Sequence, residues 1–455
     1  MLFAAWGYRA SSVTCSIAGL TAGALAAGLL ATGRLSGGVI GSGGVFSLPV
    51  VACLVLGAIA LAASFRTLIA TPAGPRVAAL AAFAASSAAV LSVALDLGVL
   101  FLSVEALALC GYGLVALSDT DRAREAAMKW FVQGSVATAV FIAGIAVLVS
   151  RTDGSLSYDA IARAAATPAA SGPLAIGFVL VLAALAFKAG AFPFHSWMPD
   201  AFETAPPVAA GVLASAGKIG PIAAAVWLAL SVAGATGNKV LVLAALLSVS
   251  SIVFGNLAAL RQRSLARMLA YSGIAQVGYA LAGVALVSGG GPVLVFGVLY
   301  GLTSLASFIF IVALREAEPD WDGSIPGLAG LSRRHPALAA SLVVIMLSLT
   351  GIPLTSGFWG KFLVFAAASV GGYLWLAIVA MLASVVSFGY YGGVLRAAYM
   401  DKEKATAPAE GGAQPEAPAR LQGFATVATV VLAISIVAVG VLPFVTGLGI
   451  FAALM

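Results

Sequence analysis

The 455-residue chain is 62% hydrophobic and only 9% charged, with a mean hydropathy of +1.09 and a formal net charge of +6. Soluble domains carry about 25% charged residues, so the composition excludes a string of soluble domains. The basic residues lie in loops between apolar runs, which is typical of membrane topology and not of nucleic-acid binding.

We predict an all-α polytopic membrane protein with about thirteen transmembrane helices, because runs able to cross about 30 Å of hydrocarbon recur along the chain. In chain order the predicted spans are residues 11–32, 46–65, 76–95, 97–117, 127–149, 173–198, 205–232, 239–259, 265–287, 291–314, 336–364, 370–398 and 422–449. Asp96 and Gly98 supply the turn between the third and fourth spans.

The distribution of basic residues predicts the orientation. Most of the 23 Lys and Arg residues lie before the first span or in loops that follow an even-numbered span. The other loops hold only Arg34, Arg151, Arg163 and Lys239. The positive-inside rule therefore predicts a cytoplasmic N-terminus and an external C-terminus. The Pro/Ala/Glu-rich stretch near the end predicts a flexible cytoplasmic linker.

Four charged side chains lie inside the predicted spans: Glu105, Lys188, Lys218 and Lys361. A lysine at the centre of a membrane helix costs about 2.5–3.5 kcal/mol on insertion scales. Two explanations involve no transport: Lys361 snorkels to the interface if its span ends early, and Glu105 with Lys188 only locks helix packing. Neither explains Lys218, and chains of buried ionisable groups are typical of proton relays.

Two predicted spans contain helix-breaking residues beside a lysine. Pro193 follows Lys188 by five residues, and Pro353 precedes Lys361 within LTGIPLTSGFWGKF. Broken backbone at membrane depth is tolerated only where it is buried in protein or lines a wet cavity. The two broken spans cross in opposite directions, which predicts two inverted five-helix repeats.

The predicted organisation has five parts. They are N-terminal transmembrane helices (1–75), a first inverted repeat (76–232), a second inverted repeat (239–398), the linker (399–421) and a C-terminal transmembrane helix (422–455).

Five segments resemble the antiporter-like subunits of respiratory complex I (NADH:quinone oxidoreductase), whose relatives occur in cation/proton antiporters and membrane-bound hydrogenases. The segments are LFLSVEAL, EAAMKWFVQGSVATAVFIAGIAVL, FKAGAFPFHSWMPDAFETAPPVAAGVLASAGKIG, NLAALRQRSLARMLAYSGIAQVGYAL and LTGIPLTSGFWGKF. PDAFETAP and AGKIG are most similar to the subunit N branch of this family.

The resemblance implies a role for each buried charge. Glu105 is similar to the family's essential glutamate, and Lys188 to its ion-pair partner. Lys218 matches the central lysine and Lys361 the terminal lysine, so each repeat is expected to form a proton half-channel. A signal that draws Glu105 from Lys188 then sends a proton from Lys218 through water towards Lys361 and out.

The resemblance also implies partners and a location. FMN, Fe–S clusters and quinone are expected in other membrane and peripheral subunits of the complex, and no cofactor or metal in this chain. The three cysteines form no cluster, which agrees with this expectation. The expected location is the bacterial inner membrane, where lipid surrounds a chain that does not function as a monomer.

The chain departs from the family pattern at two positions. Gln276 stands where many relatives have histidine, and glutamine carries no proton at neutral pH. Either water bridges Lys218 and Lys361, or the route differs. Glu105 falls on the fourth predicted span instead of the family's fifth, so one N-terminal helix is missing.

Other assignments stay open at this point. An Mrp-type Na⁺/H⁺ antiporter subunit would use the same lysines, although the sequence has no carboxylate-rich sodium site beyond Glu105. A hydrogenase or ferredoxin module in place of the NADH module is a second alternative, and a structural membrane anchor is a third. His195, predicted near the cytoplasmic end of its span, and Tyr271 are further candidates for the proton path. For His195 a helix-packing hydrogen bond is an equal alternative.

Overall fold

The computed structural model describes residues 2–31, 47–167, 171–236, 238–286, 290–401 and 423–446, and the regular elements of this part are helices. Up to the first helix break they are α1 (Leu2–Ala31), α2 (Leu48–Ala63), α3 (Phe65–Ala70), α4 (Gly74–Leu91), α5 (Leu97–Ala116), α6 (Asp121–Val149), α7 (Tyr158–Ala165) and α8 (Ser171–Ala189). Beyond it they are α9 (Trp197–Thr204), α10 (Pro207–Ala214), α11 (Ala216–Thr236), α12 (Asn238–Ala259), α13 (Leu265–Val284), α14 (Gly290–Ala317), the 3-10 helix η4 (Pro326–Leu328), α15 (Leu331–Arg334), α16 (Pro336–Thr350), α17 (Ser356–Val370), α18 (Leu374–Tyr399) and α19 (Phe424–Thr446).

Each predicted span corresponds to one helix or to two consecutive helices, so the all-α membrane fold is confirmed. Within the described ranges, ten helices are long and apolar enough to cross a membrane, and α2, α16 and α17 are shorter apolar helices. Two predicted boundaries are wrong: the span at 173–198 continues through α9, and the one at 336–364 continues through α17. Almost all of the predicted linker 399–421 lies outside the described residues, as do Arg34 and the side chain of Lys239.

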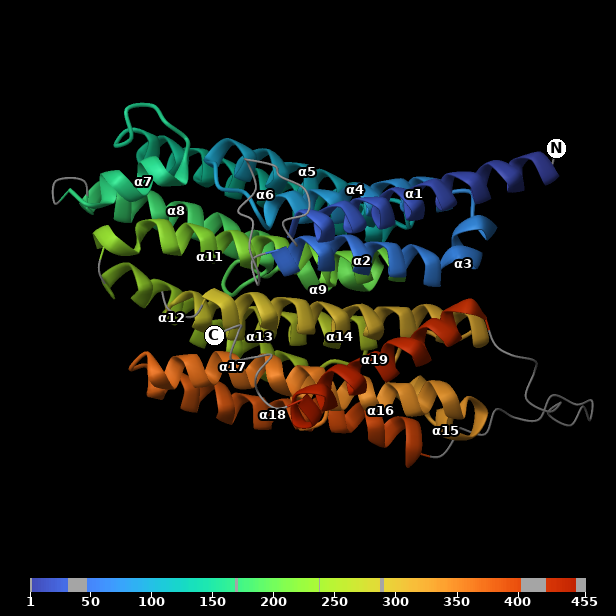
Figure 1. Cartoon of the computed structure of the whole chain (residues 1–455). Coiled ribbons are helices and arrows are strands. Elements are labelled where there is room, and N and C mark those ends of the chain that lie inside the picture. The colour runs from blue at the N-terminus through green and yellow to red at the C-terminus, as the bar shows by residue number, and fades with distance from the viewer. Residues whose placement is uncertain are drawn as a thin grey trace, which may run out of the picture.

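The helices run side by side along one long axis (Figure 1). The N-terminal helices α1, α4 and α5 lie on one side of the bundle and α16, α17 and α18 on the other, with α14 between them. The C-terminal α19 returns across the bundle to pack on α14, α16 and α17. The last span therefore covers the broken helix of the second repeat.

The inverted repeats are visible in two matching loop contacts. Asp96 caps α5 and Ser264 caps α13, each by accepting a hydrogen bond from a backbone N–H in the first helical turn. Each cap residue also forms an isolated β-bridge to the loop after its repeat's third helix, Asp96 with Ser157 and Ser264 with Ser324. The two loops adjoin α7 and α15, which lie at opposite ends of the bundle (Figure 1), as inverted repeats require.

Both predicted broken helices are present, and each first half ends in the same way. α8 is followed by Gly190 at φ +79° and α16 by Gly351 at φ +92°. A left-handed residue just after a helix is most often glycine, because other residues there meet a steric penalty. Pro193 and Pro353 follow shortly afterwards and lack the N–H that a continuing helix needs. The last carbonyls of α8 and α16 therefore stay without helical partners inside the bundle.

A third interruption, which we did not predict, divides the seventh span between α10 and α11. Ser215 leaves the helical conformation at φ −101° and ψ −88°, and its hydroxyl donates to the Gly211 carbonyl at 2.7 Å. Pro221, inside α11, then lacks the N–H that would bond the carbonyl of Gly217. The predicted span at 205–232 is present as Pro207–Ser231, but its interruption at Ser215 was not predicted.

We predict that Gly351→Ala destabilises the protein by about 1–2 kcal/mol, the cost of a left-handed backbone for a residue with a Cβ. An added Cβ would also lie 3.0 Å from the Lys361 Cδ. Thermal unfolding of the purified protein in detergent measures this change. Gly393→Ala is the control, because its Cβ would meet nothing within 4 Å and alanine favours a helix. Equal melting temperatures for both variants would contradict the prediction.

Candidate functional site

Glu105 and Lys188 form an ion pair inside the first repeat. The Lys188 Nζ lies 3.0 Å from the Glu105 Oε1, and the Thr138 hydroxyl donates to the same oxygen at 2.8 Å. The three residues lie on α8, α5 and α6, with Lys188 in the last turn of α8. The side chain of Lys188 is 5% exposed and that of Glu105 22%. The pair is therefore buried on its lysine side and partly open on its carboxylate side.

Lys218 lies in the first turn of α11 and has no carboxylate beside it in the described part of the chain. The residue is 1% exposed, and its Nζ donates to the Ala189 carbonyl at the end of α8. The same Nζ lies 2.7 Å from the Met198 Sδ and 5.7 Å from the ring centroids of Trp197 and Phe202. Aromatic faces attract a cation, so backbone and rings together replace a counter-ion.

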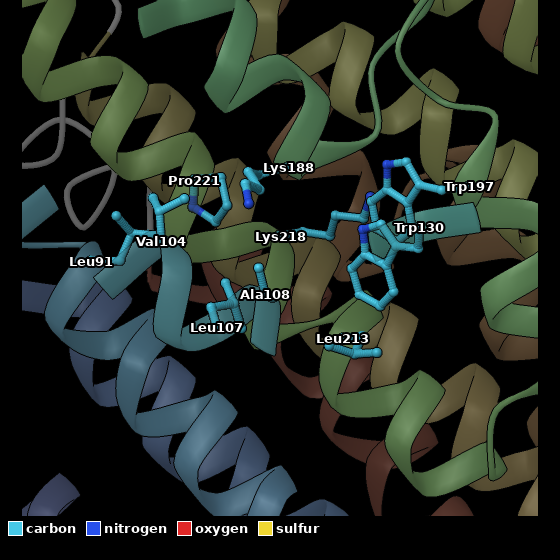
Figure 2. Close-up of a pocket in the computed structure, with 11 residues that line it drawn as sticks. Leu91, Val104, Leu107, Ala108, Trp130, Lys188, Trp197, Leu213, Lys218 and Pro221 are labelled. Carbon is cyan, nitrogen blue, oxygen red and sulfur yellow. The ribbon is translucent and has the colours of Figure 1, made fainter. Parts of the chain in front are cut away.

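One cavity of about 20 Å³ is lined by both Lys188 and Lys218. Figure 2 shows the two lysine side chains on its wall, with Trp130 and Trp197 beside Lys218. The two indole rings stack with centroids 4.0 Å apart and form a flat wall. A volume of this size holds about one water molecule. The two lysine side chains therefore border one space about the size of a single water molecule.

Lys361 is held at the break of the second broken helix. Its Nζ donates to the carbonyls of Leu349 and Thr350 at 3.0 and 2.9 Å and to the Ser384 hydroxyl at 2.9 Å. It also lies 4.8 Å from the centroid of the Tyr279 ring. The residue is 5% exposed. Snorkelling to the interface, which we had left open for Lys361, is therefore wrong.

Lys218 and Lys361 are both held by backbone carbonyls instead of a carboxylate. Each ammonium contacts carbonyls in the last turn of a broken helix, Ala189 of α8 or Leu349 and Thr350 of α16. Such carbonyls lack helical partners and form the negative end of the helix dipole. The sequence predicted the lysines and the breaks but not these carbonyl partners. The glycine after each first half-helix is the signal that could have located them.

Gln276, the position where the family pattern led us to expect histidine, lies beside Lys361. Its amide donates to the Leu349 carbonyl at 3.1 Å, which also accepts from Lys361. The two side chains line a second cavity of about 10 Å³, together with Thr303 and Ser348. This cavity shares no lining residue with the one beside Lys218. A third cavity of about 10 Å³ is lined by apolar residues; it shares Pro221 with the cavity beside Lys218 and includes Val277, the neighbour of Gln276.

His195 and Tyr271, the other proposed path residues, both pack on Phe254. His195 lies within the break between α8 and α9, not at the cytoplasmic end of a span as predicted. Its ring packs on those of Phe192 and Phe254, with centroids 5.3 and 4.4 Å apart. Tyr271 packs on Phe254 at 6.3 Å. The His195 ring thus packs among aromatic side chains, and its Nδ1 has no hydrogen-bond partner among the described residues.

No group of three or more His, Cys, Asp or Glu side chains lies close enough to hold a metal ion, as far as the described residues extend. The side chains gathered at the site, Glu105, the lysines and nearby hydroxyl groups, are of types that can exchange protons.

Comparison with known sequences gives a consistent family. The sequence model of "NADH:quinone oxidoreductase/Mrp antiporter, TM" matches residues 94–387. The NADH-quinone oxidoreductase subunit N of Alkalilimnicola ehrlichii is 38% identical over 325 residues, which cover 70% of this chain and 65% of the relative. Subunit N 2 of Acidobacterium capsulatum is 41% identical over 338 residues, which cover 71% and 67%. The match therefore spans about two thirds of each relative's length.

Solved structures extend the likeness to nearly the whole chain. A chain of respiratory complex I from Thermus thermophilus is 27% identical, with a TM-score of 0.77 and 98% of both chains covered. A chain of the archaeal membrane-bound sulfane sulfur reductase is 23% identical with a TM-score of 0.84, over 99% of this chain and 96% of that one. A chain of the Mrp complex from Dietzia sp. is 20% identical with a TM-score of 0.80, over 100% and 94%. The last two show the fold alone.

The geometry of the ion pair predicts strong coupling between its members. Removing either Glu105 or Lys188 leaves a partly buried charge without its partner, which costs more than removing both. We expect Glu105→Gln and Lys188→Met to show a coupling free energy of about 1–3 kcal/mol in a double-mutant cycle measured by thermal unfolding.

The matched control is the exposed pair of Asp121 and Arg124, whose side chains are 99% and 57% exposed. The same cycle with Asp121→Asn and Arg124→Met should give little coupling, because exposed pairs contribute little to stability. Additive effects at Glu105 and Lys188 would mean that the two residues do not act as a pair.

Proposed function

Because the chain belongs to the NADH:quinone oxidoreductase/Mrp antiporter transmembrane family, we propose that it is a proton-translocating membrane subunit of an NADH:quinone oxidoreductase, of the subunit N type. Curated relatives at 38% and 41% identity carry that name, whereas the Mrp likeness at 20% supports only the fold. The observation that carries the proposal is the cavity shared by Lys188 and Lys218, with Glu105 as the counter-charge of Lys188.

The first step of the proposed mechanism is separation of the ion pair. While Glu105 holds Lys188, the positive charge of Lys188 is balanced and its effect on Lys218 is small. Glu105 is the more exposed member of the pair, so a neighbouring subunit can reach it from the bundle surface between α5 and α6. A charge or movement at that surface draws the carboxylate away.

The second step moves a proton from Lys218. Once Lys188 is unbalanced, its positive charge acts across a cavity that admits about one water molecule. Like charges repel strongly in a medium of low dielectric constant, which favours loss of the proton from Lys218. Lys361 is the next lysine along the proposed relay, and transfer to it requires water to enter the region between the two cavities.

The energy for this cycle has to come from partner subunits. Moving one charge against the membrane potential costs about 2.3 kcal/mol per 100 mV, and we assign no redox group to this chain. The proposal places FMN, Fe–S clusters and quinone in the partners. It also places the chain in the bacterial inner membrane, with the α12–α13 loop and the N-terminus on the cytoplasmic side and the C-terminus outside, as the distribution of basic residues suggests.

Purification of the tagged chain from native membranes in mild detergent tests the proposed partners. We expect NADH-oxidising and quinone-site subunits to appear by mass spectrometry, because the chain transports protons only when a redox module drives it. Recovery of hydrogenase subunits would indicate that a hydrogenase module takes the place of the NADH module. Recovery of small antiporter subunits alone would contradict the proposal and require a test of Na⁺/H⁺ exchange.

Lys218→Ala should abolish or strongly reduce proton pumping while leaving assembly intact, because it removes the ammonium that shares the cavity with Lys188. Glu105→Gln should slow pumping as well, because Lys188 loses its counter-charge. Proton uptake per NADH oxidised, in inverted membrane vesicles, measures both effects. Lys129→Ala is the control, since that lysine is exposed at one end of α6. Normal pumping by Lys218→Ala would refute the relay.

A further inference from the structure

Among the described residues, the polar side chains that contact Lys361 lie towards one end of the bundle. Towards the α12–α13 loop, the Lys361 Nζ contacts Ser384 at 2.9 Å and the Tyr279 ring at 4.8 Å. The Tyr279 hydroxyl in turn interacts with Ser384 and accepts from the Asn256 amide at 3.4 Å. The Tyr390 hydroxyl donates to the Asn256 Oδ1 at 3.0 Å. A continuous set of hydroxyl and amide groups thus begins at Lys361.

This polar set leads to one end of the bundle. Asn256 lies in the last turn of α12, directly before the α12–α13 loop, and Tyr390 lies in the half of α18 that ends at Tyr399. Tyr279 belongs to α13, and helical side chains tilt towards the helix N-terminus, which for α13 is the same loop. Asn256, Tyr279 and Tyr390 are 2%, 1% and 6% exposed. The set therefore crosses the protein interior and not its lipid-facing surface.

The opposite side of Lys361 is apolar. Residues 280–284 of α13, 290–299 of α14, 362–368 of α17 and 374–383 of α18 contain no hydroxyl, amide or charged side chain. Within this part of the chain Gly283 lies against Val293 and Val364, and Leu286, Ala368 and Ala377 form a buried cluster. We refer to these four stretches as the apolar plug. Nothing in it can exchange a proton with Lys361.

We propose that Lys361 takes up protons from the α12–α13 end of the bundle through Tyr390, Asn256, Tyr279 and Ser384, while the apolar plug closes its other side. This inference rests on the proposed function and changes one step of it. Lys361 is then a loading site with its own supply, not only the last residue on the way out. Release to the far side requires the plug to rearrange or to admit water.

The transfer balances at every atom. In the structure the Ser384 hydroxyl accepts from Lys361 and donates to the Thr350 carbonyl at 2.9 Å. On loading it turns to give that proton to a neutral Lys361 Nζ and receives the phenolic proton of Tyr279, and a hydronium ion from the α12–α13 end restores the phenol and becomes water. Asn256 donates to the Tyr279 oxygen, which leaves that phenol's own proton free to point to Ser384. An amide does not titrate near neutral pH, so Asn256 orients the two phenols and water carries the proton past it. Only Lys361 changes charge.

The groups that face Lys361 from each neighbouring helix support this route. α13 presents Tyr279 and Gln276, α16 presents carbonyls, and α18 presents Ser384. From α14, Tyr300 lines the adjoining cavity. Among the described residues no carboxylate contacts Lys361. Its proton can therefore be exchanged only with hydroxyl groups and water.

Proton uptake per NADH oxidised in inverted vesicles, with the assembled complex, tests the proposal. We expect Tyr279→Phe and Asn256→Leu to lose pumping to the level of Lys361→Ala while NADH oxidation and assembly persist. Tyr158→Phe is the matched control, because Tyr158 is a buried phenol on α7 whose hydroxyl has no hydrogen-bond partner among the described residues. Lowering the pH on the α12–α13 side should partly restore uptake in Tyr279→Phe but not in Lys361→Ala.

The outcomes separate this inference from the proposed function. If Lys361→Ala loses pumping while Tyr279→Phe, Tyr390→Phe and Asn256→Leu all pump normally, the route is overturned and the relay stands. If Lys361→Ala itself pumps normally, Lys361 carries no proton, and both the route and that step of the relay are overturned. Restoration by acid in Lys361→Ala would also overturn the route.

Discussion

An ammonium group buried away from water needs polar contacts, and in this protein the backbone supplies most of them. Lys218 and Lys361 contact carbonyls at the ends of α8 and α16, which are free only because those helices stop inside the bundle. The stops in turn depend on Gly190 and Gly351, whose left-handed backbone turns the chain away. The lysines, the breaks and the glycines therefore form one structural unit in each repeat.

The two repeats use this unit differently. In the first, the carbonyl belongs to α8 and the lysine to α11, so the contact joins consecutive spans. In the second, α16 supplies the carbonyls and α17 the lysine, so both lie on one broken helix. The first repeat also has Glu105, which lies on α5, and a second lysine, Lys188, which lies in the last turn of α8. A change at Glu105 therefore acts on the first repeat directly and on the second only through protein packing and water.

The sequence was sufficient to predict the helical membrane fold, the inverted repeats and the broken helices, because hydropathy and proline positions depend on short stretches of chain. Their ends were predicted less well, since α9 continues into the more polar stretch PDAFET and α17 continues to Val370, beyond the predicted end at residue 364. The interruption at Ser215 was missed because serine has no intrinsic helix-breaking geometry. The bridge from Asp96 to Ser157 was missed because it joins residues that are neighbours only after folding.

Within the site, too, the features that depend on residue type were predicted and those that depend on helix packing were not. A pair between Glu105 and Lys188 was one of the sequence hypotheses, because opposite charges inside a membrane are expected to meet. The carbonyl partners of Lys218 and Lys361 carry no side-chain signature of their own, and only the glycine after each first half-helix could have pointed to them. The Asn256, Tyr279 and Tyr390 group comes from α12, α13 and α18, and only the packing of these three helices brings it together.

The small size and separation of the two lysine cavities have a consequence for the membrane as an electrical insulator. A permanent water-filled channel past Lys218 and Lys361 would let protons run back down the stored gradient and short-circuit the membrane. Cavities of about 20 and 10 Å³ with no shared lining residue break that conductor into pieces. Current then flows only during the brief intervals when water joins them, so leakage is limited by hydration of the gap and not by the lysines.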